Sequence, residues 1–168
     1  AGPIDAGASG TTARFVTAVA GLASGMSVVD GTRRMRRRPI GPLVDGLRSL
    51  GVDASSSEGF PPVTVRGGRL GGGPVVVDST ASSQFATALL LVAPMADAPV
   101  TLTLGGPIAS RPYLEGTVEV MRSFGAVVEV EGDTFSVAPT GYRKAHFSVE
   151  ADASAAVYPA VAAAITGG

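Results

Sequence analysis

The chain contains no cysteine and only one histidine, His146. Without cysteine it has no disulfide bond, no thiolate nucleophile and no cysteine-ligated metal, and one histidine cannot form a site that needs two or three. Tryptophan is absent too, and the net charge is −1, so the composition does not favour nucleic acid as a partner. No run of about 18 apolar residues predicts a membrane span. We therefore expect no metal, no cofactor, no nucleic acid and no membrane partner.

What the chain does contain is enough apolar sequence for a real core. Of its 168 residues, 45% are hydrophobic and 16% charged, and 23 are glycine. These proportions exclude a disordered chain and predict many tight turns. The N-terminus, AGPIDAGASG, has no initiator methionine and none of the features of a secretory signal. We expect an internal fragment of a cytoplasmic protein.

An internal repeat organises the sequence. The run FVTAVAGLASGMSVVDG from Phe15 aligns with FATALLLVAPMADAPVTLTLGG from Phe85, an offset of 70 residues. Further along, RRPIGPLVDGLRSLGV around Pro39 aligns with SRPYLEGTVEVMRSFGA around Pro112. A third copy begins near the end, where FSVEADASAAVYPAVAAAI resembles VVVDSTASSQFATALLLVA. The repeat predicts three segments: 1–75, 76–147 and 148–168.

Each complete unit reads as βαβαββ, which predicts an α/β fold. Small hydroxyl residues are expected to cap the first helix of each unit, and an Arg-Pro pair is expected to open the second. Leucines at helical spacing, such as Leu43 and Leu47, predict its buried face, and a glycine ends it. The hydroxyl pairs are Thr11 and Thr12 in the first unit, and Ser82 and Ser83 in the second. The Arg-Pro pairs are 38–39 and 111–112, and the terminal glycines are Gly51 and Gly125.

Two glycine- or arginine-rich segments are candidate anion sites. GASGTTAR (7–14) is a glycine-rich turn that leads into a helix, where free N–H groups favour an anion; such turns are also common without a ligand. RRMRRR (33–38) has five arginines in six positions. The residues alone leave three readings open for it: a solvated loop, a nucleic-acid patch, or a bidentate site for phosphate or carboxylate.

Two polar segments open the helices of the second unit. STASSQF (79–85) places more hydroxyls and amides before an apolar helix than capping requires, which favours a polar small-molecule site. SRPY (110–113) occupies the matching place after the next strand. For Tyr113, local reasoning predicts burial in the core. Local reasoning assigns no catalytic role to His146 or to Asp152.

Taken in order, these segments resemble the 5-enolpyruvylshikimate-3-phosphate synthase family from end to end. The family's LGNAGTxxR element appears as AGASGTTAR, its GxxRMxxRPIGxLVDxLxxLG as GTRRMRRRPIGPLVDGLRSLG, and its SSQFxxALLLxAP intact from Ser82. Its SxPYxxxTxxxMxxFG element follows from Ser110, and VExDASxAxYxxAAAAI lies near Glu150. Where many members have Asn and Pro, this chain has Ala8 and Phe15. The resemblance implies the enolpyruvyl transferase fold, with repeated βαβαββ units.

The resemblance also implies an activity. The family transfers the carboxyvinyl group of phosphoenolpyruvate to the 5-hydroxyl of shikimate 3-phosphate and releases phosphate, a step of aromatic amino acid biosynthesis. The first segment would then carry loops for phosphoenolpyruvate and the second loops for shikimate 3-phosphate. The implied shikimate 3-phosphate residues are Ser82, Ser83, Gln84, Ser110 and Tyr113; the implied phosphoenolpyruvate residues are Gly10, Arg34 and Gln84.

The family pattern also marks what this chain lacks. Its fold has two similar domains with the active site between them, and segment 148–168 corresponds to the crossing toward the second, absent domain. We expect no catalytic acid or base in this chain, and hence no activity from it alone. Of the arginine cluster, only Arg34 matches the anion position; Arg38 is expected to serve structure, and Arg33, Arg36 and Arg37 to be solvated. Two alternatives are a UDP-sugar enolpyruvyl transferase relative and a polyanion-binding module that uses Arg33–Arg38.

Overall fold

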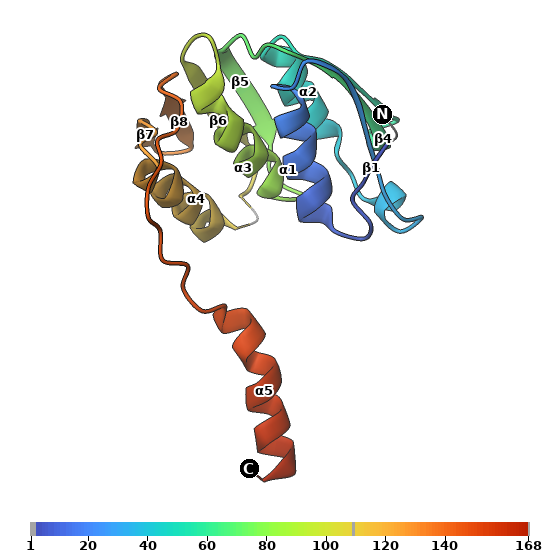
Figure 1. Ribbon diagram of the computed structural model, residues 1–168, viewed down its shortest axis with the longest axis vertical. Coiled ribbons are helices and arrows are strands. Elements are labelled where there is room, and N and C mark those ends of the chain that lie inside the picture. Colours follow the sequence, from blue (N-terminus) through green and yellow to red (C-terminus); the bar gives the residue numbers. More distant parts are fainter. Residues whose placement is uncertain (1–2, 109, 168) are drawn as a thin grey trace.

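The computed structural model describes residues 3–108 and 110–167, which form two similar α/β units followed by one further helix (Figure 1). Each unit has the element order β-α-β-α-β-β, and each builds a sheet of four strands. In both sheets the first two strands are parallel and the other pairs antiparallel. The predicted α/β fold with repeated βαβαββ units is confirmed.

The first unit has the sheet order β1-β2-β4-β3. A short 3-10 helix, η1, lies within the arginine-rich loop that joins β2 to α2. The elements are β1 (Ile4–Asp5), α1 (Gly10–Ala20), β2 (Gly25–Asp30), η1 (Met35–Arg37), α2 (Gly41–Ser49), β3 (Asp53–Ser57) and β4 (Phe60–Gly67).

The second unit repeats this arrangement with the sheet order β5-β6-β8-β7. Its first strand starts at Gly73, so the boundary expected after residue 75 falls inside that strand. The elements are β5 (Gly73–Asp78), α3 (Gln84–Val92), η2 (Ala93–Met95), β6 (Val100–Gly105), α4 (Arg111–Ser123), β7 (Val128–Glu131) and β8 (Thr134–Val137).

One hydrophobic core joins the two units. In β5, Val75 and Val77 are buried while Val76 between them is 70% exposed, as alternation in a strand requires. Helix α3 is apolar on nearly all sides and packs against α1, α2 and α4, and Figure 1 shows it beside α1. A helix that is apolar all round is stable only when it is surrounded. The second unit therefore depends on helices of the first for its burial.

The helix ends match the sequence in part. The expected caps Thr11 and Thr12 lie inside the first turn of α1, and Ser9 caps that helix by accepting a hydrogen bond from the Thr12 N–H. Helix α4 begins at Arg111–Pro112 as expected, but α2 begins only at Gly41. The later start of α2 is due to a tertiary contact, because the N–H groups of residues 40 and 41 donate to the Gly59 carbonyl of the β3–β4 turn.

Both helix-terminating glycines are confirmed. Gly51 follows α2 and Gly125 follows α4, each with a φ of +86°, a left-handed conformation that favours glycine. Their N–H groups donate to Arg48 and Arg122 carbonyls of the last turn, both at 2.9 Å.

The C-terminal segment, residues 138–167, follows the two units and belongs to neither sheet. Residues 138–152 form no helix or strand, and α5 (Ala153–Thr166) follows them and stands apart from the body of the molecule (Figure 1). The expected third copy is thus present only as its helix. Val157, Tyr158 and Ile165 on α5 are between 56% and 80% exposed. None of the described helices has the length and apolar character needed to cross a bilayer.

Candidate functional site

A cavity of about 720 Å³ lies where the second unit meets α1. The structure brings together there five residues that the sequence analysis singled out, although residues 84 and 110 are far apart along the chain. These are Ser82, Ser83, Gln84, Ser110 and Tyr113. The remaining lining residues are Thr11, Phe15, Ala81, Thr87, Leu91, Gly116, Thr117 and Val120.

The sheet topology explains this meeting. Strands β5 and β6 are parallel neighbours, with Asp78 opposite Gly105 at their carboxyl ends. The segments that follow the two strands must therefore emerge at the same edge of the sheet. One leads through Ser82 and Ser83 into α3, and the other through Ser110 into α4. Two helix N-termini with hydroxyl side chains thus border one cavity, an arrangement that favours an anion.

Tyr113 lies at the cavity and not in the core, so the prediction from local sequence was wrong. Its side chain is 70% exposed. Helix α4 buries Leu114, Val118 and Met121, a stripe with helical spacing, and residue 113 falls beside this stripe. The tyrosine ring is therefore free to form a wall of the cavity.

Arg14 of α1 is the main residue that the sequence analysis missed. The residue is only 3% exposed. Its Nη1 lies 2.6 Å from Gln84 Oε1 and 3.3 Å from Ser82 Oγ, and its Nη2 donates to the Pro39 carbonyl at 3.2 Å. The guanidinium also lies over the Phe85 ring, 4.7 Å from its centre. Arg14 thereby connects the first unit to the cavity residues of the second.

The charge of Arg14 is not balanced by a carboxylate. No ion pair among the described residues includes this arginine, and its Nε has no hydrogen-bond partner there. Burial, helped by the positive charge of nearby Arg38, lowers the pKa of Arg14 to about 10. Arg14 remains protonated at neutral pH, as a partly desolvated cation beside the cavity.

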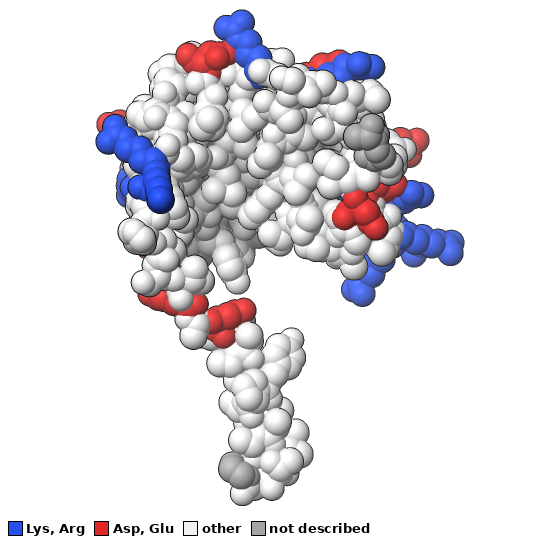
Figure 2. All heavy atoms as spheres, in the orientation of Figure 1, with Lys and Arg blue, Asp and Glu red and all other residues white. Residues whose placement is uncertain are grey.

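The arginine-rich loop forms a second, separate recess. Arg33, Arg34 and Arg37 line a cavity of about 520 Å³, and all three are exposed. Basic side chains project at the edge of the molecule beside β1, whereas the surface over α1 and α3 is nearly free of charge (Figure 2). Arg34 does not line the cavity that contains Ser82. The structure thus separates Arg34 from Gln84, although the resemblance assigns both residues to phosphoenolpyruvate.

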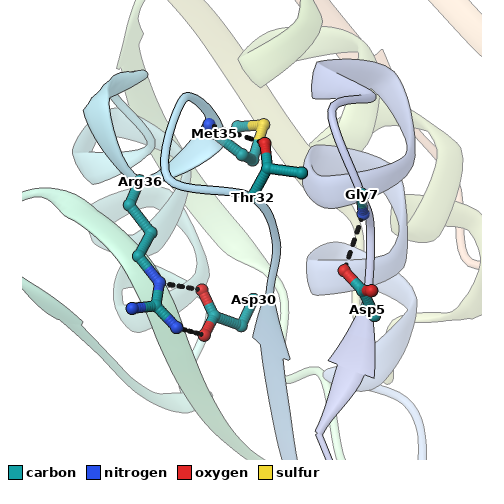
Figure 3. Close-up of polar contacts among 6 residues, drawn as sticks. All are labelled: Asp5, Gly7, Asp30, Thr32, Met35 and Arg36. Atoms are coloured by element: carbon teal, nitrogen blue, oxygen red, sulfur yellow. Dashed lines mark hydrogen bonds and ion pairs between the residues drawn. The ribbon is translucent and has the colours of Figure 1, made fainter.

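Arg36 is exposed, as the sequence analysis expected, but it is also paired with a carboxylate. Its guanidinium makes a two-pronged contact with the Asp30 carboxylate at the end of β2, with distances of 2.9 and 2.5 Å (Figure 3). The hydrogen bonds from Arg36 hold the pKa of Asp30 below its usual range. Met35 between the arginines is fully buried, and its N–H donates to Thr32 Oγ1. These contacts fix the loop, and Arg33, Arg34 and Arg37 remain exposed.

The Arg38 guanidinium fills the space beside Gly10. The Arg38 Cζ lies 2.6 Å from the position that a Cβ on Gly10 would occupy. Arg38 is half-buried against the start of α1 and close enough to Arg14 to depress its pKa. This placement fits the structural role expected for Arg38. In the described part of the chain, no three Asp, Glu or His side chains come close enough to share a metal ion.

Comparisons with known proteins place the chain in a family. The family model described as EPSP synthase (3-phosphoshikimate 1-carboxyvinyltransferase) matches residues 1–168. A 3-phosphoshikimate 1-carboxyvinyltransferase of Rhizobium etli is 48% identical over 159 residues, which cover 93% of this chain and 38% of that protein. The enzyme of the same name from Methanothermobacter thermautotrophicus is 45% identical and is covered over 39% of its length.

A solved structure supports the same assignment. The EPSP synthase of Acinetobacter baumannii matches with a TM-score of 0.73 and 26% sequence identity, over 86% of this chain and 32% of that one. The chain thus spans about two-fifths of the length of the relatives named above. The chain belongs to the EPSP synthase family.

Proposed function

We propose that this chain supplies the shikimate 3-phosphate site, and part of the phosphoenolpyruvate site, of a cytoplasmic 3-phosphoshikimate 1-carboxyvinyltransferase. The observation that carries the proposal is the single cavity into which Ser82, Ser83, Gln84, Ser110 and Tyr113 converge. All five correspond to the family's substrate residues by resemblance.

The chemistry of the cavity suits a phosphorylated polyol. Ser82, Ser83 and Ser110 offer hydroxyls at two helix N-termini, where a phosphate gains both hydrogen bonds and a favourable helix dipole. Gln84 offers an amide for a ring hydroxyl, and the Tyr113 ring provides an apolar wall. The volume of about 720 Å³ is within the range of small-molecule sites.

Arg34 is the arginine of this chain proposed to bind phosphoenolpyruvate. Its exposed guanidinium lies in the separate recess with Arg33 and Arg37, and a guanidinium suits carboxylate or phosphate in bidentate fashion. The two recesses share none of their described lining residues. The residues that bring the two substrates together would come from the remainder of a full-length enzyme.

The proposal places the proton transfers outside this chain. Carboxyvinyl transfer needs a base for the 5-hydroxyl proton and an acid for the methylene carbon. Of the described residues that line the larger cavity, none is Asp, Glu, His, Lys or Arg. We therefore expect that this chain binds shikimate 3-phosphate but does not release phosphate from the two substrates.

Calorimetric titration of the chain with shikimate 3-phosphate tests the proposal. Ser110→Ala should weaken binding by about tenfold, because a hydrogen bond to a charged group is lost. Ser123→Ala is the matched control, since Ser123 is an exposed serine on the same helix that does not line the cavity. Failure of the unmodified chain to bind, or equal effects of the two substitutions, would contradict the proposed site, and steady phosphate release would contradict the assignment of the chemistry.

A further inference from the structure

Arg14 and Gln84 occupy the same position in the two repeats and contact each other. Their separation of 70 residues equals the repeat offset between Phe15 and Phe85. A guanidinium can only donate hydrogen bonds. The atom of Gln84 that lies 2.6 Å from Arg14 Nη1 must therefore be the amide oxygen, so the arginine fixes which way the amide faces.

The remaining contacts of Gln84 follow from this orientation. Its Nε2 donates one hydrogen to Thr11 Oγ1 at 3.0 Å. An amide nitrogen carries two hydrogens, so one is left over. Because Gln84 lines the larger cavity, the amide presents a donor to a ligand there, while its acceptor oxygen is occupied by Arg14.

The hydroxyl of Ser82 is also restricted to donating a hydrogen bond toward the cavity. Its Oγ accepts from Arg14 Nη1 and from the Gln84 backbone N–H, both at 3.3 Å. A hydroxyl has two lone pairs and one hydrogen. With both lone pairs used, the hydroxyl hydrogen of this cavity-lining serine is what remains for a ligand.

We infer that Arg14 is a positioning residue that turns Ser82 and Gln84 into hydrogen-bond donors toward the cavity, so that the site selects ligands rich in acceptor oxygens, above all a phosphate. The inference rests on the proposed function for the identity of the ligand. Arg14 acts through its two partners, and its unpaired positive charge also attracts an anion through a poorly solvated region. The cavity selects an anion although none of the described residues that line it is cationic.

The variant Gln84→Glu separates this role from a purely structural one. The carboxylate would pair with Arg14, a buried cation that has no counter-ion in the described part of the chain. The variant should therefore raise the melting temperature of the ligand-free chain by about 2 °C or more. The same variant has no amide hydrogen and adds a negative charge. It should therefore weaken shikimate 3-phosphate binding by at least about tenfold. Stability and binding should change in opposite directions.

Gln84→Met is the matched control, because methionine has a similar length but neither the charge nor the amide. It should lower the melting temperature, since Arg14 loses an acceptor, and it should also weaken binding. A fall in melting temperature for Gln84→Glu, or binding as tight as that of the unmodified chain, would overturn the inference. If Gln84→Glu is stabilised but the unmodified chain does not bind shikimate 3-phosphate, the positioning by Arg14 stands and the proposed function fails.

Discussion

Val19 and Leu89 occupy equivalent positions in the two repeats, yet one is 55% exposed and the other fully buried. The two helices that carry them, α1 and α3, start from the same place in a βαβαββ unit. Helix α3 has α1, α2 and α4 around it, whereas α1 packs mainly against α3 and its own sheet. The position of a helix among its neighbours, and not its place in the repeat, decides which side chains are buried.

The loops of the two units differ more than their sheets do. After β2 the chain forms the arginine-rich loop with η1, and after β6 it passes directly to Ser110 and α4. The sheet orders are nevertheless the same, β1-β2-β4-β3 and β5-β6-β8-β7. The repeated framework thus sets where a site can form, and the loops supply its chemistry: cations in the first unit and hydroxyls in the second.

Truncation of the equivalent residues Leu89 and Val19 should give the largest difference between the units. Leu89 is completely buried, and its Cδ1 lies 2.5 Å from the position that a Cβ on Gly46 of α2 would occupy. We expect Leu89→Ala to cost about 2–5 kcal/mol of unfolding free energy, because it leaves a cavity between α2 and α3. Val19→Ala should change stability by less than about 0.5 kcal/mol. Urea denaturation measures both, and similar values would show that α1 and α3 are equally buried.

Within the arginine-rich loop, Arg34 and Arg37 should differ in their effect on the full-length enzyme. Arg34 and Arg37 are both exposed and line the same recess, but the family resemblance assigns only Arg34 to phosphoenolpyruvate. We expect Arg34→Ala to lower kcat/KM for phosphoenolpyruvate by about thirtyfold or more, since an anion loses its bidentate partner.

Arg37→Ala is the control for this prediction and should stay close to the unmodified enzyme. Equal losses from the two substitutions would indicate a diffuse positive field and would contradict the assignment of Arg34. If the protein binds a polyanion, and if that binding weakens steeply as the salt concentration rises, the polyanion-binding alternative would be favoured.

The sequence predicted the framework well because the framework is local and repeated. Hydrophobic spacing, the glycines after α2 and α4, and the paired segments after β5 and β6 all follow from rules that act within one unit. The start of α2 was misplaced because Gly59, from the β3–β4 turn, accepts hydrogen bonds there. Arg14 was missed because its partner Gln84 belongs to the other unit. Both features depend on contacts between segments that are distant in sequence, within the first unit for α2 and between the two units for Arg14, and local patterns could not predict such contacts.

The smallest expected difference in unfolding free energy lies between the segments that follow the two sheets. After β4 the chain buries Leu70, whereas after β8 Tyr142 remains 38% exposed and donates its hydroxyl hydrogen to the Leu91 carbonyl at 2.9 Å. Tyr142→Phe should cost about 1 kcal/mol at pH 8, the usual net value of one hydrogen bond. A Leu70→Ala variant should cost about 2 kcal/mol or more, because a fully buried side chain is truncated. Urea denaturation of both variants measures this difference.

The pH dependence of Tyr142 sharpens the same comparison. Partial burial raises the pKa of Tyr142 to about 12, above its usual value of 10. A pKa raised by folding means that the unfolded chain loses the proton first, so the stabilisation is complete below pH 10 and is lost as the pH rises toward 12. The lowered pKa of Arg14 has the opposite effect in this range, but it is common to both proteins. Between pH 9 and pH 11 the unmodified chain should therefore lose more unfolding free energy than Tyr142→Phe. An equal loss would show that the Tyr142 hydroxyl titrates as freely as in the unfolded chain.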